Sequence, residues 1–350
     1  MRIFRITLLF MLCFALLIGS ALAGKQIISL QFPEDFSGEL RDVLPDGTLV
    51  VCGGIGLPME KRPALMEIQL DGTITDVTPD ADTFDGSYRD FIGLDEDSYI
   101  LVRDVPNDPE YREYVGRIDS DQISWQSKPI ANLSAIDRLK DGILVTCKPQ
   151  PVTAEIRKLD FDGNEVWKLR FEERMVVKGI LVGDDFHVAY GMVYEDPQPD
   201  NRDQRVSSLI FAFDDAGKLL WRHDGVELSY SSDLTDAAWT GDGGVIAISS
   251  SCAYKFDANG EIWRREFDRF GNTAVITLED GRSLVICGAH HETGMPMRII
   301  GDDGILLKET YLSEIGLGSA DPLWVGDDLY LAVSSGMKGI VQLVKLELAF

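Results

Sequence analysis

Short apolar runs, each preceded by a turn rich in Asp and Gly, recur along the whole chain. Asp and Gly favour tight turns, and a run of β-branched and aliphatic residues after such a turn predicts a buried strand. Seven copies of this unit occur, at residues 45–51, 95–102, 140–145, 183–189, 241–247, 279–286 and 326–333. Recurrence at this spacing indicates a repeat architecture.

A second unit lies between successive copies of the first. It has alternating apolar residues on both sides of an Asp/Gly turn, which predicts a β-hairpin. The clearest copies are residues 158–167, 212–221 and 254–263, and weaker ones are 118–125, 69–74 and 300–306. The two units together give four strands per repeat.

The predicted fold is therefore all-β, a β-propeller of about seven four-stranded blades. Only six hairpins accompany seven first units, and the missing one can be built from the two ends of the chain, residues 25–32 and 339–350. Pairing of these N- and C-terminal strands would close the ring and remove its exposed edges. No linker divides the chain, so residues 24–350 are predicted to form a single domain.

The first 23 residues have the order of a signal peptide. Arg2 and Arg5 precede the apolar run 8–18, and Ser20, Ala21 and Ala23 supply the small residues of an A-x-A ending. Cleavage after Ala23 is favoured over a single-pass anchor because the apolar run is shorter than the roughly 20 residues of a membrane span. We predict an extracytoplasmic protein that is secreted, periplasmic or on the cell surface, with no membrane span after cleavage.

The charge of the chain narrows the choice of partner. Removing the 23-residue leader from the 350-residue chain leaves 327 residues, about 47 for each of seven blades. The leader holds two arginines and no acid, so the net charge changes from −25 to −27. Such a charge disfavours nucleic acid and anionic lipid and favours a self-repelling monomer.

Four cysteines remain after the leader: Cys52, Cys147, Cys252 and Cys287. An even number in an exported protein ordinarily suggests disulfides. Three of them, however, follow the same kind of apolar run in different repeats, and equivalent positions of separate blades lie too far apart for a bond. Free, buried cysteines are therefore favoured over a disulfide pair.

The hairpins carry a motif, D-x-x-G-x-x-x-W. It occurs at Asp160/Gly163/Trp167 and Asp214/Gly217/Trp221, and one residue shorter at Asp257/Gly260/Trp263. This motif resembles the repeat of pyrroloquinoline-quinone-type β-propellers. The resemblance implies that the tryptophans dock neighbouring blades. Its catalytic members have adjacent cysteines and a calcium ion on the axis; this chain has no adjacent cysteines, so we expect a non-catalytic member without a cofactor.

Metal binding has little support in the sequence. Acid-rich turns such as 160–164 suggest calcium, but tight turns need Asp and Gly in any case, and turn formation is the favoured explanation. Calcium between loops of different blades is left open. The adjacent His290 and His291 would point to opposite sides of an extended chain, which argues against a site made from both. We assign no metal ligand and no catalytic residue.

Function is expected on the loops that join the second and third strands, because variable loops on a rigid ring are where such scaffolds bind. The candidate contacts are Tyr111, Tyr194, His290 and Glu292. We therefore predict a binding or interaction module for a protein, a peptide or a cell-surface glycan. The alternative is a propeller enzyme of the hydrolase, lyase or sulfotransferase type with a site at the mouth of the axial channel.

Overall fold

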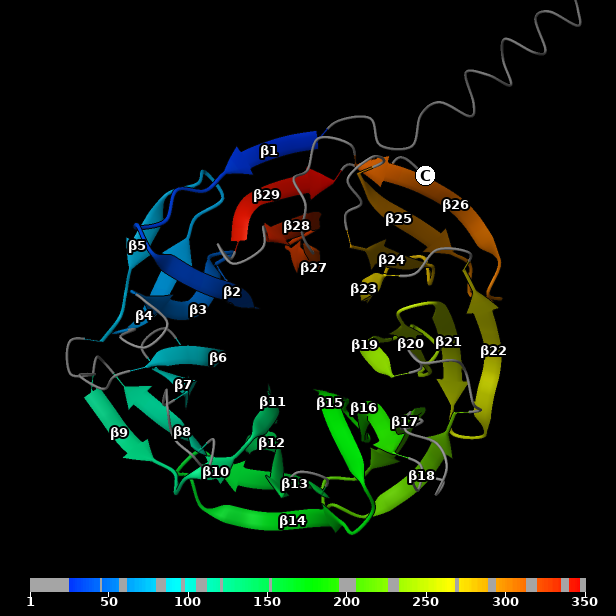
Figure 1. Ribbon diagram of the computed structural model, residues 1–350, viewed down its shortest axis with the longest axis horizontal. Coiled ribbons are helices and arrows are strands. Elements are labelled where there is room, and N and C mark those ends of the chain that lie inside the picture. Colours follow the sequence, from blue (N-terminus) through cyan, green and yellow to red (C-terminus); the bar gives the residue numbers. More distant parts are fainter. Residues whose placement is uncertain are drawn as a thin grey trace, which may run out of the picture.

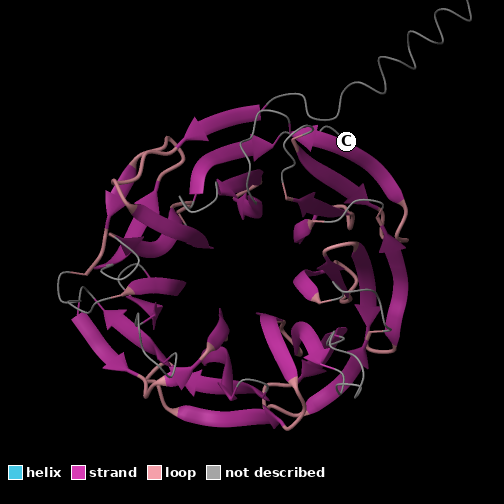
Figure 2. Ribbon diagram, in the orientation of Figure 1, coloured by secondary structure: helices cyan, strands magenta, loops and turns pink. Residues whose placement is uncertain are grey.

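The computed structural model describes residues 25–44, 46–56, 62–79, 86–95, 98–104, 112–119, 122–150, 153–194, 206–225, 233–267, 271–288, 294–312, 320–334 and 340–346. These residues form seven antiparallel sheets arranged around a central axis, a seven-bladed β-propeller (Figure 1). Strands and their connections account for all of them, and Figure 2 shows no helix in this part of the chain. Accordingly, no helix of the described ranges could cross a membrane.

Blades 1 to 6 each run from an inner strand to an outer strand in chain order. Blades 1 to 3 are formed by β2 (Phe36–Val43), β3 (Leu49–Ile55), β4 (Arg62–Ile68) and β5 (Ile74–Asp76); β6 (Ser87–Asp95), β7 (Ser98–Asp104), β8 (Arg112–Asp119) and β9 (Gln122–Gln126); and β11 (Leu133–Arg138), β12 (Gly142–Gln150), β13 (Thr153–Asp160) and β14 (Glu165–Phe171). Blade 2 has a short fifth strand, β10 (Ile130–Ala131), which also pairs with β8.

Blades 4 to 7 repeat the arrangement. They are formed by β15 (Met175–Leu181), β16 (His187–Tyr194), β17 (Val206–Phe213) and β18 (Leu219–Asp224); β19 (Leu234–Trp239), β20 (Val245–Ser249), β21 (Cys252–Asp257) and β22 (Gly260–Glu266); β23 (Asn272–Thr277), β24 (Ser283–Cys287), β25 (Met295–Ile300) and β26 (Leu306–Leu312); and β27 (Ala320–Val325), β28 (Asp328–Ser334), β29 (Ile340–Leu346) and β1 (Lys25–Ser29).

The ring closes as the sequence predicts. The first strand that the structure describes, β1, pairs antiparallel with the last, β29, from Lys25 opposite Leu346 to Ser29 opposite Gln342. Blade 7 thus takes its outer strand from the other end of the chain, and the two lie side by side in Figure 1. Blade 7 therefore has four hydrogen-bonded strands.

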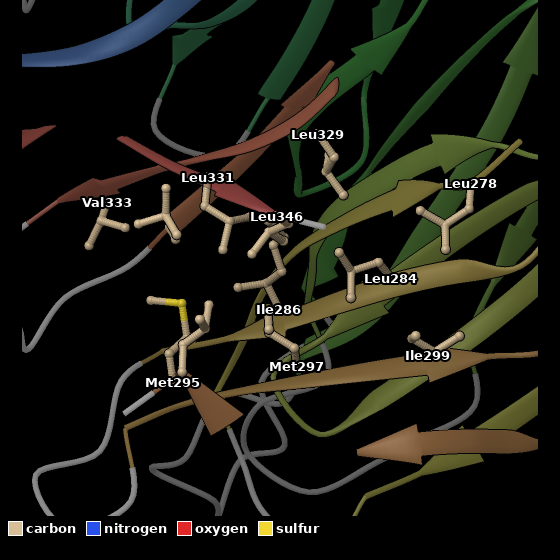
Figure 3. Packing of buried hydrophobic residues seen from close by; sticks show 14 residues of the cluster. Leu278, Leu284, Ile286, Met295, Met297, Ile299, Leu329, Leu331, Val333 and Leu346 are labelled. Atoms are coloured by element: carbon tan, nitrogen blue, oxygen red, sulfur yellow. The ribbon is translucent and has the colours of Figure 1, made fainter. Parts of the chain in front are cut away.

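The core lies between the blades. Seven clusters of buried apolar side chains occur, one at each interface between neighbouring blades. Figure 3 shows one of them, where Ile286 and Met295 of blade 6 lie beside Leu331 and Val333 of blade 7. Because the second and third strands are covered on both faces, they are largely apolar and buried, as in β20, whose five residues are all buried, whereas outer strands such as β14 alternate.

Tryptophans of three outer strands, in blades 2, 3 and 5, fasten their blades to the next. The indole Nε1 groups of Trp125, Trp167 and Trp263 donate to the carbonyl oxygens of Phe161, Asp215 and Asp302, at 2.7, 2.8 and 2.8 Å. Each acceptor lies in the hairpin turn of the following blade. At these three junctions the tryptophan of one blade therefore binds the turn of the next, whereas Trp221 of blade 4 packs against Phe186 and His223.

Each of these three turns requires glycine at the position where the tryptophan ring of the preceding blade packs. Gly217 has a φ of 76°, and a Cβ atom there would lie 2.8 Å from the Trp167 ring. Gly163 and Gly304 face Trp125 and Trp263 in the same way. Only glycine combines this backbone conformation with so close an approach.

All four cysteines of the described chain are free and buried, as predicted. The prediction that three share one repeat position is wrong for Cys52. Cys147 and Cys287 oppose Leu133 and Asn272, immediately before a β-bulge, whereas Cys52 opposes Glu39, one residue further from the bulge. That one-residue offset turns the Cys52 side chain to the other face of its sheet.

Candidate functional site

The two faces of the ring differ in what they carry. Connections between second and third strands, and between blades, lie on one face, which we call the loop face. Turns between first and second strands, and between third and fourth, lie on the other, which we call the hairpin face. Every inner strand therefore begins at the loop face and ends at the hairpin face, around the axis seen in Figure 1.

A β-bulge interrupts the inner strand of each of blades 1 to 6 at an equivalent point. A bulge leaves one residue outside the ladder and redirects its side chain. The six bulged residues are Arg41, Arg89, Ser134, Lys178, Thr235 and Thr273. Three of them are cations in a strongly acidic chain, and they come from blades 1, 2 and 4.

Lys148 of blade 3 completes a cluster with two of these cations. It follows Cys147 near the loop-face end of β12, where its backbone N–H donates to Asn132 O at 3.0 Å. Burial lowers the pKa of its ammonium group, and the charges of Lys178 and Arg89 lower it further. We call Arg89, Lys148 and Lys178 the cation cluster; it draws one residue from each of three adjacent blades.

Two members of the cation cluster have counter-ions. Arg89 pairs with Glu113, which is 3% exposed and also accepts the backbone N–H of Leu133 in the next blade. Lys178 pairs with Asp233, just before the inner strand of blade 5. Among the described residues Lys148 forms no ion pair, so its charge is the one left available to an anion.

A layer of carboxyl groups lies further along the inner strands, towards the hairpin face. Asp42, Asp90 and Asp236 directly follow the bulged residue, and Asp137 lies near the end of β11. Asp42, Asp137 and Asp236 each accept a backbone N–H of the following blade, at distances of 3.0, 3.2 and 2.8 Å; the donors are Gly93, Val182 and Val275. These side chains join neighbouring blades close to the axis.

Burial raises the pKa values of these carboxyl groups. The pKa of Asp137 rises to about 6 through burial and the charges of Asp90 and Asp42, although hydrogen bonds from Arg138 and Val182 oppose the change. Burial likewise raises the pKa of Asp236 to about 6. Raised carboxyl pKa values can mark catalytic sites, but here each of these groups already accepts backbone hydrogen bonds.

Blade 4 has Gly179 where blades 2 and 5 have Asp90 and Asp236. Tyr190 of β16 fills the space, since a Cβ atom on Gly179 would lie 2.2 Å from its hydroxyl oxygen. That hydroxyl donates to Asp236 Oδ1 at 3.2 Å. The tyrosine thus makes the connection to blade 5 that an aspartate makes elsewhere.

A cavity of about 760 Å³ borders the carboxyl layer, lined by Asp42, Asp90, Asp137, Arg41 and Arg138 among others. Arg138 donates to Gly93 O at 2.7 Å. No group of three or more His, Cys, Asp or Glu side chains in the described ranges is placed to hold a metal ion. In the acid-rich turn 160–164 the carboxylate accepts hydrogen bonds from the backbone of its own turn. Asp160 Oδ1 accepts the N–H groups of Asp162 and Asn164, as the turn interpretation predicts.

The structure describes one of the four binding residues predicted from the sequence. Tyr194 lies half-buried at the loop-face end of β16, where its N–H donates to Arg174 O at 2.7 Å and the Arg174 guanidinium lies 5.7 Å from its ring centre. Tyr111, His290 and Glu292 fall outside the described residues, so their placement stays a prediction. The sequence reading missed the cation cluster, whose signal was a basic residue shortly after the start of several predicted inner strands.

Comparison with known proteins adds little beyond the fold. No family model and no curated protein matches the sequence. Solved structures do match, among them a protein of unknown function from Bacteroides caccae, at 14% identity, covering 66% of this chain and 89% of that one, with a TM-score of 0.43. A likeness of that degree assigns neither a family nor an activity.

Proposed function

We propose that this chain is an exported binding module that takes an acidic group of a protein, peptide or cell-surface glycan at the loop-face end of the axis. The observation that carries the proposal is that Lys148, which forms no ion pair with any described residue, lies near the charges of Arg89 and Lys178. In a chain of net charge −25, like charges from three blades are brought together at a cost in repulsion that a bound carboxylate or sulfate would relieve. Tyr194 and Arg174 lie on the same face.

Two further parts of the proposal rest on weaker support. The docking of Trp167 on Asp215 fits a non-catalytic relative of the pyrroloquinoline-quinone-type propellers. The order of the first 23 residues supports export. A propeller enzyme is less favoured, because His187 and His223 lie away from the axis, on the first residue of β16 and on outer strand β18, and the inner carboxylates already hold backbone N–H groups.

Lys148→Gln is expected to weaken binding of anionic probes at least tenfold. A labelled hexaglutamate peptide and a sulfated hexasaccharide serve as probes, titrated by fluorescence anisotropy at low and at physiological salt, since screening should weaken the interaction. Lys218→Gln is the matched control, because it removes one exposed cation from the hairpin face. Equal losses in the two variants, or no binding of either probe at millimolar concentration in low salt, would contradict the proposal.

A further inference from the structure

A groove of about 1090 Å³ crosses the hairpin face over blades 3, 4 and 5. The cation cluster lies on the other face of the ring. Its walls are the turns between first and second strands of these blades and the hairpin turn of blade 4. Phe186, Trp239, Asp184, Asp185, Asp215 and Lys140 are the lining residues that matter for its chemistry.

Blades 3 and 5 each carry a lysine on the third strand that blade 4 lacks. In blades 3 and 5, Lys158 and Lys255 occupy the third-strand position opposite the docking tryptophan. Their side chains, 7% and 3% exposed, reach the acid of the turn in their own blade, Asp141 at 2.8 Å and Asp242 at 2.6 Å. Lys345 does the same for Asp328 in blade 7.

In blade 4 the equivalent residue, opposite Trp221, is Ala212. The turn of this blade nevertheless carries two acids, Asp184 and Asp185, and Asp215 stands beside them. Within the described residues of blade 4, no lysine pairs with any of them.

Lys140 of the neighbouring blade pairs with one of the three acids and lies near the charges of the other two. Lys140 pairs with Asp184 at 2.9 Å, but the two side chains are 85% and 88% exposed, and such pairs contribute little. The hydrogen bond and charge of Asp184 raise the pKa of Lys140, and the charges of Asp215 and Asp185 add to the effect. Asp185 itself has no ion pair within the described part of the chain.

Aromatic and buried groups give the groove a fixed shape. The rings of Phe186 and Trp239 meet edge to face at 5.3 Å, and Trp239 Nε1 donates to Val182 O at 3.0 Å. The exposed carboxylate of Asp215 is held 2.8 Å from Nε2 of the buried His187. Aromatic rings beside a carboxylate that is held in place are a favourable setting for an ammonium or guanidinium group.

We propose that this groove binds a lysine- or arginine-bearing segment of a partner protein. The partner's cation supplies, between Asp184, Asp185 and Asp215, the charge that Lys158 and Lys255 supply within their own blades. The volume of the groove, about 1090 Å³, lies just above the range of about 300 to 1,000 Å³ for small-molecule sites, which favours a chain segment over a single free amine. The inference does not depend on the loop-face proposal.

The test is binding of a labelled hexalysine peptide to the full chain, followed by anisotropy and by tryptophan emission, to which Trp239 in the groove contributes. Asp184→Asn/Asp185→Asn is expected to reduce affinity at least tenfold and to abolish the change in emission. Both residues are exposed, so the double variant should fold like the parent.

Because any basic peptide is attracted to so acidic a protein, the control removes the same charge elsewhere. Glu261→Gln/Glu266→Gln changes two exposed acids of outer strand β22 and is expected to alter affinity less than twofold. Equal losses in the two double variants, or no loss in either, would overturn the proposal. Displacement of the peptide by free lysine at equal concentration of side chains would overturn the choice of a chain segment.

Discussion

Gly217→Ala is expected to lower the free energy of unfolding by roughly 3 kcal/mol. About 1 kcal/mol comes from placing an alanine at a φ of 76°. The rest, about 2 kcal/mol, comes from a Cβ atom 2.8 Å from the Trp167 ring, which would push the indole away from Asp215 and loosen the junction of blades 3 and 4. Urea unfolding followed by tryptophan fluorescence measures the change.

Gly281→Ala separates the two contributions. Its φ of 82° is nearly the same, but nothing lies within 4 Å of the position of a Cβ atom there. This variant should therefore lose only about 1 kcal/mol. If the two variants were equally stable, the tryptophan would not be the reason for glycine at residue 217.

Mild acidification is expected to stabilise the protein. The folded pKa values of Asp137 and Asp236, about 6, lie above the ordinary value of 3.8, so between these pH values the folded state binds more protons than the unfolded state. Stability should rise as the pH falls from 7 to between 4 and 5. We expect roughly 1 to 2 kcal/mol from each group, since one pKa unit corresponds to about 1.4 kcal/mol and both keep some contact with water.

The gain should reverse below about pH 4. Contacts with Lys255 and Thr240 lower the pKa of Asp242 to about 2, and the turn hydrogen bonds of Asp160 lower the pKa of its carboxyl group. These groups stabilise the fold only while ionised, so their contribution is lost as they take up protons.

Urea unfolding midpoints at pH 7, 5 and 3 test both the expected rise in stability on mild acidification and the expected loss at lower pH. Asp137→Asn removes one titrating group and should reduce the gain between pH 7 and 5, whereas Glu261→Gln, an exposed acid, should leave it unchanged. A midpoint that falls steadily from pH 7 to 5 in the parent protein would rule the explanation out.

The blades could be predicted from the sequence because their determinants are local and repeated. Each Asp/Gly turn and the apolar run after it, such as Asp141–Gly142 before β12, specify a tight turn and a buried strand without reference to the rest of the chain. Closure of the ring followed from counting, since six hairpins and seven first units leave one outer strand to be supplied by β1.

The cation cluster could not be predicted in this way. Whether Arg89 or Lys178 faces the axis depends on a bulge in the inner strand, and a shift of one residue in register would turn either side chain to the opposite face. Lys148 joins them only through the packing of three blades. The replacement of a third-strand lysine by Ala212 is visible in the sequence once the repeats are aligned on their tryptophans.

Pairing of β1 with β29 also has a consequence for how the chain folds. Blade 7 combines β1 with β29, so it cannot assemble until the chain has been synthesised as far as β29. Six blades can condense from neighbouring segments, but the seventh requires a loop closed over nearly the whole chain, which is slow. During that interval the partner edge of β29 is exposed, and this is the stage at which the protein is most open to wrong pairing with another copy.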